Sequence, residues 1–266
     1  MTATTADSAR GPGSVRPAGL STLAADRAFI VGCALLFTAC AGATVRLCWS
    51  TSQPMPMRGG GLLAEAAAFV CVWAVMMVAM MLPSFVPALL GHRRLLREAH
   101  VRRVGTATVL AGVGYFLVWA SSGAVVYLLS AGLMTAEMRW PVLRPWATRA
   151  GGVVVLAGGA VQLTAWKTRQ LERCRMGLLC GRTPSGTGWS AHWDGLRYGV
   201  NCCLCCAGFT LALLGSGMMN LAAVGGIAAL ITLERMARRP DRAARATGIL
   251  LLAAAMAISG HFSGSD

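Results

Sequence analysis

Hydrophobic residues in this chain fall into long, nearly uninterrupted runs that are separated by short polar segments. A helix needs roughly 20 apolar residues to cross a membrane, and most of these runs reach or approach that length. Such runs are typical of transmembrane helices rather than of the core of a soluble domain. The pattern therefore predicts an all-α, polytopic membrane helix bundle of about seven transmembrane helices, over residues 29–49, 62–90, 107–131, 150–166, 198–214, 218–234 and 246–260.

The polar segments predict how these helices are oriented. Most of the 24 lysines and arginines lie in the amino-terminal tail and in segments 91–106, 166–198 and 235–245. Basic segments stay on the cytoplasmic side of a membrane, so the amino terminus is expected inside and the chain in the plasma membrane. Because basic segments flank the apolar stretch 198–234 on both sides, an even number of crossings must lie within it. The stretch is therefore predicted to be a hairpin of two short helices.

Composition supports a chain that contacts lipid. Hydrophobic residues make up 56% of the sequence, and mean hydropathy is +0.60. The net charge is +14, and nearly all of the basic residues that produce it lie in short segments between apolar runs. This placement indicates membrane topology rather than nucleic-acid binding. Residues 1–26 lack apolar periodicity and predict a disordered cytoplasmic tail, and residues 261–266 form a short tail. A cleavable signal peptide is the alternative for the first run, although that run is longer than the apolar region of a signal peptide.

Candidate chemistry begins with a cluster of cysteines. Four of the ten cysteines fall between Cys202 and Cys206. On a helix, Cys202 shares a face with Cys205 and Cys206 through i,i+3 and i,i+4 spacing, whereas Cys203 points elsewhere. Thiols on the cytoplasmic side stay reduced, and soft sulfur ligands select Cu(I). Cys202, Cys205 and Cys206 are therefore the predicted ligands of a soft metal ion, with copper(I) as the expected ion.

Methionines supply further sulfur. Met76 with Met80, and Met77 with Met81, form two adjacent i,i+4 pairs on the second predicted helix. Pro83 is expected to kink that helix just beyond them. Met219 lies at the turn between the fifth and sixth predicted helices. These five thioethers are predicted to be secondary metal ligands, and the alternative is that methionine fills irregular space in the core.

Two other functions compete with metal binding. Cysteines can act as small residues that let helices pack closely, which would make the chain a structural or assembly subunit without metal. Cys202 and Cys205 also form a C-x-x-C pair, as in a membrane thiol-disulfide oxidoreductase. Gln162 and Asn220 are expected to form interhelical hydrogen bonds, and the alternative is that they are secondary metal ligands. No nucleophile elbow, phosphate-binding loop or pair of carboxylates supports hydrolase or kinase chemistry.

Several motifs occur in an order that resembles a known family. They are Met-Met-Val-Ala-Met-Met-Leu-Pro-Ser at 76–84, Gly114-Tyr115 with Trp119, Gln162-Leu163-Thr164 with Lys167, and Cys174-Arg175. With the Cys and Met-Asn series, the chain resembles a bacterial family of predicted metal-binding integral membrane proteins, sometimes labelled copper chaperones. The resemblance covers about residues 62–260. It implies a protein of the bacterial inner membrane that exchanges copper with a donor or acceptor protein.

The resemblance also assigns residues. The family's C-x-x-C-C falls on Cys202, Cys205 and Cys206, its Gly-x-Met-Asn on Gly217, Met219 and Asn220, and its acidic-basic helix end on Glu234 and Arg235. The methionine-rich signature falls on Met76, Met77, Met80 and Met81. The chain departs from the family at Val161, at Thr164-Ala165-Trp166-Lys167, and at Gln170, Ala207 and Thr210. These departures, with Cys203 as an additional thiol, imply a metal site that differs in part from the family's.

Overall fold

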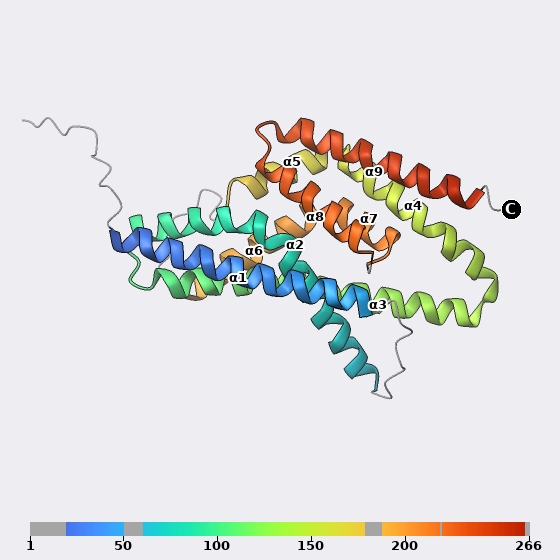
Figure 1. Cartoon of the computed structure of the whole chain (residues 1–266), viewed down its shortest axis with the longest axis horizontal. Helices are drawn as coiled ribbons and strands as arrows, with labels where there is room; N and C mark the ends of the chain where they lie inside the picture. Colours follow the sequence, from blue (N-terminus) through green and yellow to red (C-terminus); the bar gives the residue numbers. More distant parts are fainter. Residues whose placement is uncertain (1–19, 51–60, 179–187, 219, 264–266) are drawn as a thin grey trace, which may run out of the picture.

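The computed structural model describes residues 20–50, 61–178, 188–218 and 220–263, and within these ranges the protein is entirely helical (Figure 1). This confirms the predicted all-α class. The helices are α1 (Leu20–Ser50), α2 (Leu62–Glu98), α3 (Val104–Arg139), the short 3-10 helix η1 (Pro141–Leu143), α4 (Arg144–Gln162), α5 (Ala165–Arg175), α6 (Gly188–Cys205), α7 (Ala207–Ser216), α8 (Leu221–Met236) and α9 (Pro240–Ser263).

Three of the described helices are long and apolar enough to cross a membrane: Leu23–Trp49 within α1, and the whole of α2 and α3. The bent pair of α6 and α7 would add a fourth crossing if the two helices form one span. Each of the seven predicted segments overlaps a helix, but α8 has only 16 residues, fewer than the roughly 20 of a typical span. Length and composition therefore support three or four spans among the described residues.

The helices form two groups that meet along α2 and α8. In the first group, α1 lies along α2, and α3 packs between α2 and α6. In the second group, α4 packs against α7 and α9. Helix α2 contains Pro83 and Pro87 and changes direction along its length (Figure 1), as expected where proline removes a backbone hydrogen bond.

Glycines let the helices approach closely at two crossings. A Cβ atom on Gly195 of α6 would lie 2.0 Å from the carbonyl oxygen of Ala111 in α3, and one on Gly158 of α4 would lie 2.5 Å from the carbonyl oxygen of Gly208 in α7. Only a residue without a side chain fits at such distances. Small residues at helix crossings are typical of membrane proteins, where close backbone packing drives helix association.

The chain between α4 and α8 differs from the prediction in two ways. The segment 166–198, expected to be a loop, contains α5, whose first turn is capped by the Thr164 hydroxyl accepting a hydrogen bond from the Lys167 amide. Helix α6 begins at Gly188 rather than at 198 and is bent by 59° from α7. The turn of the predicted hairpin is present, because α7 ends at Ser216 and Gly217 adopts a φ of 92° that suits glycine.

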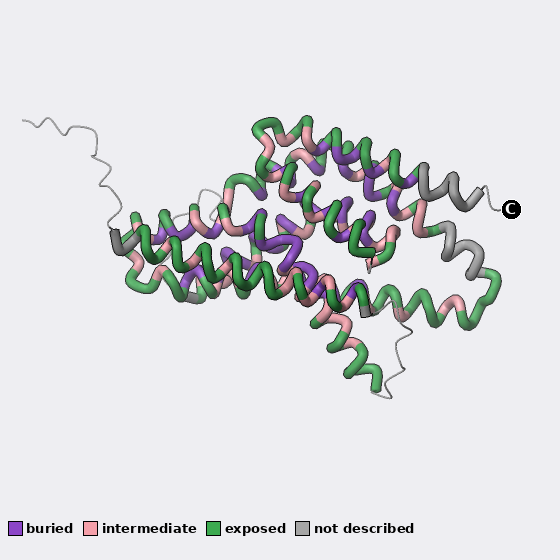
Figure 2. The backbone as a smooth tube through the Cα atoms, viewed as in Figure 1, coloured by how far each residue is buried: buried purple, intermediate pink, exposed green. Residues whose placement is uncertain are grey.

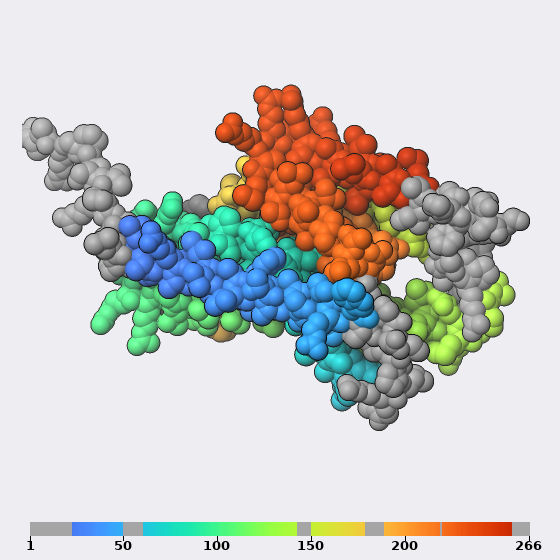
Figure 3. Space-filling model, in the orientation of Figure 1, coloured from blue at the N-terminus to red at the C-terminus, as the bar shows by residue number. Residues whose placement is uncertain are grey.

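Burial is concentrated where α2, α3, α6, α7 and α8 meet, whereas α1 and the carboxyl-terminal half of α3 are largely exposed (Figure 2). Figure 3 shows α1 lying across the surface of the molecule, along α2. Large apolar side chains such as Leu35 and Leu128 are among the exposed ones. A helix with apolar residues on its outer face suits contact with lipid rather than with water.

Candidate metal centre

The cysteine cluster lies at the break between α6 and α7. Cys202 and Cys205 belong to the last turns of α6, and Cys206 is the N-cap residue that precedes α7. The amide of Cys206 still donates to the carbonyl oxygen of Cys202, at 2.9 Å. The ammonium of Lys167 donates to the carbonyl oxygen of Cys205 at 2.7 Å, which satisfies a carbonyl that a helix end leaves without a partner.

The three cysteines predicted to share one face are all buried, with exposed fractions of 0% for Cys202, 2% for Cys205 and 1% for Cys206. Cys203 is only half-buried, as expected for a residue on another face. The thiol of Cys206 interacts with those of Cys202 and Cys205. The Cys206 thiol therefore links the other two sequence-predicted thiols within the core.

A fourth thiol, which the sequence reasoning did not include among the ligands, adjoins this group. Cys174 at the end of α5 is buried, and its thiol interacts with that of Cys205. The Tyr198 hydroxyl fixes the backbone there by donating to the carbonyl oxygen of Cys174 at 3.0 Å. The four thiols, Cys174, Cys205, Cys206 and Cys202, form a row of neighbouring contacts, called the thiol row below.

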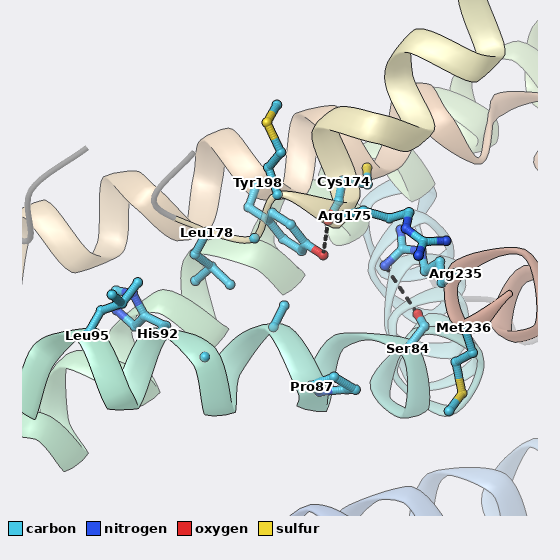
Figure 4. Close-up of a pocket in the computed structure, with 14 residues that line it drawn as sticks. Ser84, Pro87, His92, Leu95, Cys174, Arg175, Leu178, Tyr198, Arg235 and Met236 are labelled. Atoms are coloured by element: carbon cyan, nitrogen blue, oxygen red, sulfur yellow. Dashed lines mark hydrogen bonds between the residues drawn. The ribbon is translucent and has the colours of Figure 1, made fainter. Parts of the chain in front are cut away.

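Arg235 contacts Cys202, the last member of the thiol row. Its Nη2 donates to the Cys202 sulfur at 2.6 Å and to the Cys206 sulfur at 3.9 Å, and its Nη1 donates to the Ser84 hydroxyl at 3.2 Å (Figure 4). The hydroxyl of Tyr115 lies 3.0 Å from the same Cys202 sulfur. Hydrogen bonds and positive charge both favour the ionised form of a thiol. The Cys202 sulfur is therefore contacted by a guanidinium and a phenol hydroxyl, both of which could stabilise negative charge on it.

A second positive charge lies beside Cys205. The Lys167 ammonium is 2.8 Å from the Glu234 carboxylate, and both side chains are almost fully buried. Burial disfavours the charged ammonium, but the neighbouring Cys205 sulfur and Glu234 carboxylate outweigh it and raise the pKa of Lys167. Glu234 also accepts hydrogen bonds from the Gln162 amide, at 3.2 Å, and from the Thr247 hydroxyl. An ion pair with its remaining atoms satisfied can persist in a protein interior.

Both polar residues singled out in the sequence form hydrogen bonds. Gln162 donates to Glu234 across α4 and α8. Asn220 instead caps its own helix, since its side-chain oxygen accepts from the amides of Ala222 and Ala223 at 3.1 and 3.2 Å. The interhelical role expected for both therefore holds only for Gln162.

The methionines of α2 lie in the same apolar core as the thiol row. Met76, Met77, Met80 and Met81 are all buried, with exposed fractions between 1% and 5%. Met218 packs against this core, whereas Met219, the fifth predicted thioether ligand, lies outside the described residues. The methionine pairs and the cysteines thus belong to the same buried cluster.

The buried sulfur donors of this core are thiols and thioethers. Within the described residues, no group of three or more His, Cys, Asp or Glu side chains is arranged to hold a metal ion, so neither a closed zinc site nor a converging set of Cys202, Cys205 and Cys206 is seen there. All described cysteines are free of disulfides. Sulfur donors in an apolar, cation-lined core are the kind of ligand that Cu(I) prefers.

Comparison with known protein families gives a match, and it covers the region that contains this centre. A family model described as copper chaperone, PpoB2, matches residues 70–258. Among curated proteins and solved structures, none matches the chain. The matched range includes the methionines of α2, the thiol row, Lys167, Glu234 and Arg235. The chain therefore belongs to the PpoB2 copper chaperone family.

Proposed function

We propose that this protein binds Cu(I) within the membrane and passes it to a partner protein. Cys202, Cys205 and Cys206 would hold the ion, and Met76, Met77, Met80, Met81 and Met219 would supply further sulfur. The observation that carries the proposal is the buried row of thiols with Arg235 at its Cys202 end and Lys167 beside Cys205. Packing alone needs neither the thiols, which alanine or glycine could replace, nor Arg235 donating to the Cys202 sulfur.

Arg235 and Lys167 are placed to offset the negative charge of thiolates in the buried core. Cu(I) binds thiolates, so the cysteines must lose protons when the ion arrives. Several buried negative charges around one monovalent ion would be costly without compensation. Arg235 lies against Cys202 and Cys206, and Lys167 lies against the backbone of Cys205. Both positive charges are thus in place before copper binds.

Copper content of the purified protein tests the proposal. The full chain would be purified in detergent under reducing conditions from copper-supplemented cells, and its metal content measured by mass spectrometry. We expect near-stoichiometric copper, lost when Cys202, Cys205 and Cys206 are replaced by serine. The matched control replaces Cys33, Cys40 and Cys71, three cysteines outside the thiol row, and should keep its copper. Absence of metal in the unmodified protein would favour a structural or assembly subunit.

The role of the methionines needs a separate variant. Leucine has nearly the volume of methionine and conserves packing, but it offers no sulfur. Replacing Met76, Met77, Met80 and Met81 by leucine should therefore weaken copper binding while the protein remains folded. Equal copper affinity in this variant would show that these residues only fill space.

Burial argues against the thiol-disulfide oxidoreductase. Reactive cysteines of that class sit in partially exposed, electropositive surroundings, whereas Cys202 and Cys205 are almost completely buried. An oxidoreductase would cycle these two thiols to a disulfide, which a gel shift after thiol alkylation would detect. We expect no such shift in protein isolated from growing cells.

We further infer a bacterial inner-membrane protein with seven spans, its amino terminus and arginine-rich helix ends on the cytoplasmic side. The support is the asymmetry of the basic segments and the helix that overlaps each predicted span. Alkaline phosphatase fused after Asp266 should be active, because that end is expected outside. The same enzyme inserted at Ala237, between α8 and α9, should be inactive. The reverse activities would contradict this topology.

A further inference from the structure

A pocket of about 460 Å³ opens between α2, the end of α8, residues 174–178 and Tyr198 of α6 (Figure 4). Small-molecule sites usually have volumes of roughly 300–1,000 Å³. Ser84, Cys174 and Arg235 lie at one end of the pocket, and His92 and Leu95 lie at the other. Its lining contains arginines but no acidic residue. The pocket is therefore large enough for a small organic molecule and positively charged.

Two lining side chains carry buried polar atoms that have no partner within the described part of the chain. They are both ring nitrogens of His92, a residue only 2% exposed, and Nε of Arg235. Buried polar groups in native proteins are nearly always hydrogen-bonded, so these atoms point to a ligand. Arginine nitrogens can only donate, and Arg175 also lines the pocket. A ligand that accepts hydrogen bonds from these arginines and is attracted by their charge would carry an anionic group.

Sulfur atoms also line the pocket. Cys174 belongs both to the pocket wall and to the thiol row, because its thiol interacts with that of Cys205. Met176 and Met236, which are 61% and 70% exposed, lie in the lining as well. A molecule in the pocket would therefore contact the first member of the thiol row.

We propose that this pocket binds a small anionic thiol that carries Cu(I), and that the ion passes from it to Cys174. The inference rests on the proposed function. The copper–sulfur bond to the carrier breaks and a copper–sulfur bond to Cys174 forms, while the Cys174 proton moves to the carrier sulfur. Copper remains Cu(I), so the exchange needs neither an oxidant nor a reductant. The ion would then pass along the thiol row from Cys174 to Cys205, Cys206 and Cys202.

A glycine in the wall allows the pocket to be filled without disturbing the helix. Gly91 of α2 lines the pocket, and a Cβ atom added there meets no other atom within 4 Å. Gly91→Leu therefore places a side chain at the pocket wall. Gly105→Leu is the matched control, because Gly105 is a helical, exposed glycine of α3 with the same open surroundings and is not part of the pocket.

The test compares two sources of copper for the full chain in detergent. Cu(I) would be supplied as its complex with glutathione, an anionic thiol, or with acetonitrile, which is small and neutral. The loading rate would be followed by copper–thiolate absorbance. We expect the ratio of the glutathione rate to the acetonitrile rate to fall by about tenfold or more in Gly91→Leu and to stay within about twofold in Gly105→Leu, since filling a pocket discriminates strongly between ligands. An unchanged ratio in Gly91→Leu would overturn the proposal.

Two further measurements separate this inference from the proposed function. Copper supplied with cysteamine, a cationic thiol, should load more slowly than copper supplied with glutathione, and equal rates would rule out recognition of an anion. Metal-free glutathione should bind the protein in calorimetry, and lack of binding would overturn the pocket assignment even if copper binds. If glutathione binds and copper does not, the proposed function fails and the delivery step fails with it.

Discussion

The guanidinium of Arg235 lies 2.6 Å from the sulfur of Cys202, although the two residues are 33 positions apart in the chain and belong to α8 and α6. The contact joins the predicted C-x-x-C-C to the acidic-basic end of α8. Arginine remains charged in proteins, and its planar group can contact several partners at once. Here it contacts Cys202, Cys206 and Ser84. Arg235 is thus placed to stabilise negative charge on the thiols.

Replacing Arg235 by glutamine should weaken copper binding without removing a copper ligand. The variant loses the charge that offsets the Cys202 and Cys206 thiolates. Residues that support metal ligands typically change metal affinity by about 10–100-fold when mutated, and we expect a decrease in this range. Competition with a Cu(I) chelator measures it.

Arg238→Gln is the control for this substitution. Arg238 follows the end of α8 and is exposed, so its loss changes the net charge equally but leaves the thiol row untouched. Equal affinities of the two variants would mean that Arg235 contributes only to net charge.

Tyr115→Phe isolates one hydrogen bond to the same sulfur. Phenylalanine keeps the stacking on Phe85, whose ring centroid is 3.9 Å from that of Tyr115, but it cannot contact Cys202 through a hydroxyl. A single hydrogen bond contributes about 1 kcal/mol, so copper affinity should fall by roughly fivefold. Tyr127→Phe, which alters a tyrosine whose ring centroid lies 5.5 Å from that of Phe69, should leave copper affinity unchanged. A larger loss in Tyr127→Phe than in Tyr115→Phe would refute this role of the hydroxyl.

Helical spacing was sufficient to predict that Cys202, Cys205 and Cys206 lie together, because residues three and four apart share a face. It could not predict Cys174, which is 31 positions from Cys205 and reaches it only through the packing of α5 against α6. The pairing of Cys174 with Arg175 in the family pattern was the available signal. Charge pattern likewise could not show that Lys167 pairs with Glu234, since the two lie on separate helices.

Hydropathy predicted where helices occur better than how many cross the membrane. The long runs of α2 and α3 were unambiguous, whereas a signal peptide was the alternative for the run in α1. The segment from Gly188 to Arg197 was expected to be part of a loop, because it belongs to the basic stretch 166–198. It is helical because it packs along α3, where Gly195 fits against Ala111. That packing is a tertiary effect that no local pattern of apolar residues contains.

Glu234→Gln should destabilise the protein strongly. It leaves the Lys167 ammonium buried without its charged partner, and removing one member of a buried ion pair typically costs about 3–5 kcal/mol. Thermal unfolding in detergent, measured without copper, should show a clearly lower midpoint. Glu172→Gln, at an exposed position of α5, should change the midpoint little.

The double variant Lys167→Met, Glu234→Leu distinguishes the cost of an unpaired charge from the loss of the pair itself. Replacing both members of a buried ion pair by apolar residues is often neutral or stabilising. The double variant should therefore be more stable than Glu234→Gln. If it is equally unstable, hydrogen bonds from Lys167 to Cys205 and from Gln162 to Glu234 matter more than the charge pair.

Gly195→Ala tests whether the contact of α3 with α6 positions the thiol row. The added Cβ atom would meet the carbonyl oxygen of Ala111 at 2.0 Å, and backbone cannot yield as a flexible side chain can. Overpacking of this kind costs about 1–3 kcal/mol. Gly105→Ala, with no atom within 4 Å of the added group, should be neutral or stabilising by about 0.5–1 kcal/mol, because alanine favours helix.

The same variant should also weaken copper binding. Tyr115 is on α3 and Cys202 is on α6, so any separation of the two helices lengthens the 3.0 Å contact between them. Gly195→Ala should therefore lower copper affinity, whereas Gly105→Ala should not. Combining Gly195→Ala with Tyr115→Phe separates the two effects: once the hydroxyl is absent, moving the helices apart cannot remove its contact again. The two losses of affinity should then be less than additive, and full additivity would show that Gly195 acts on the thiols by another route.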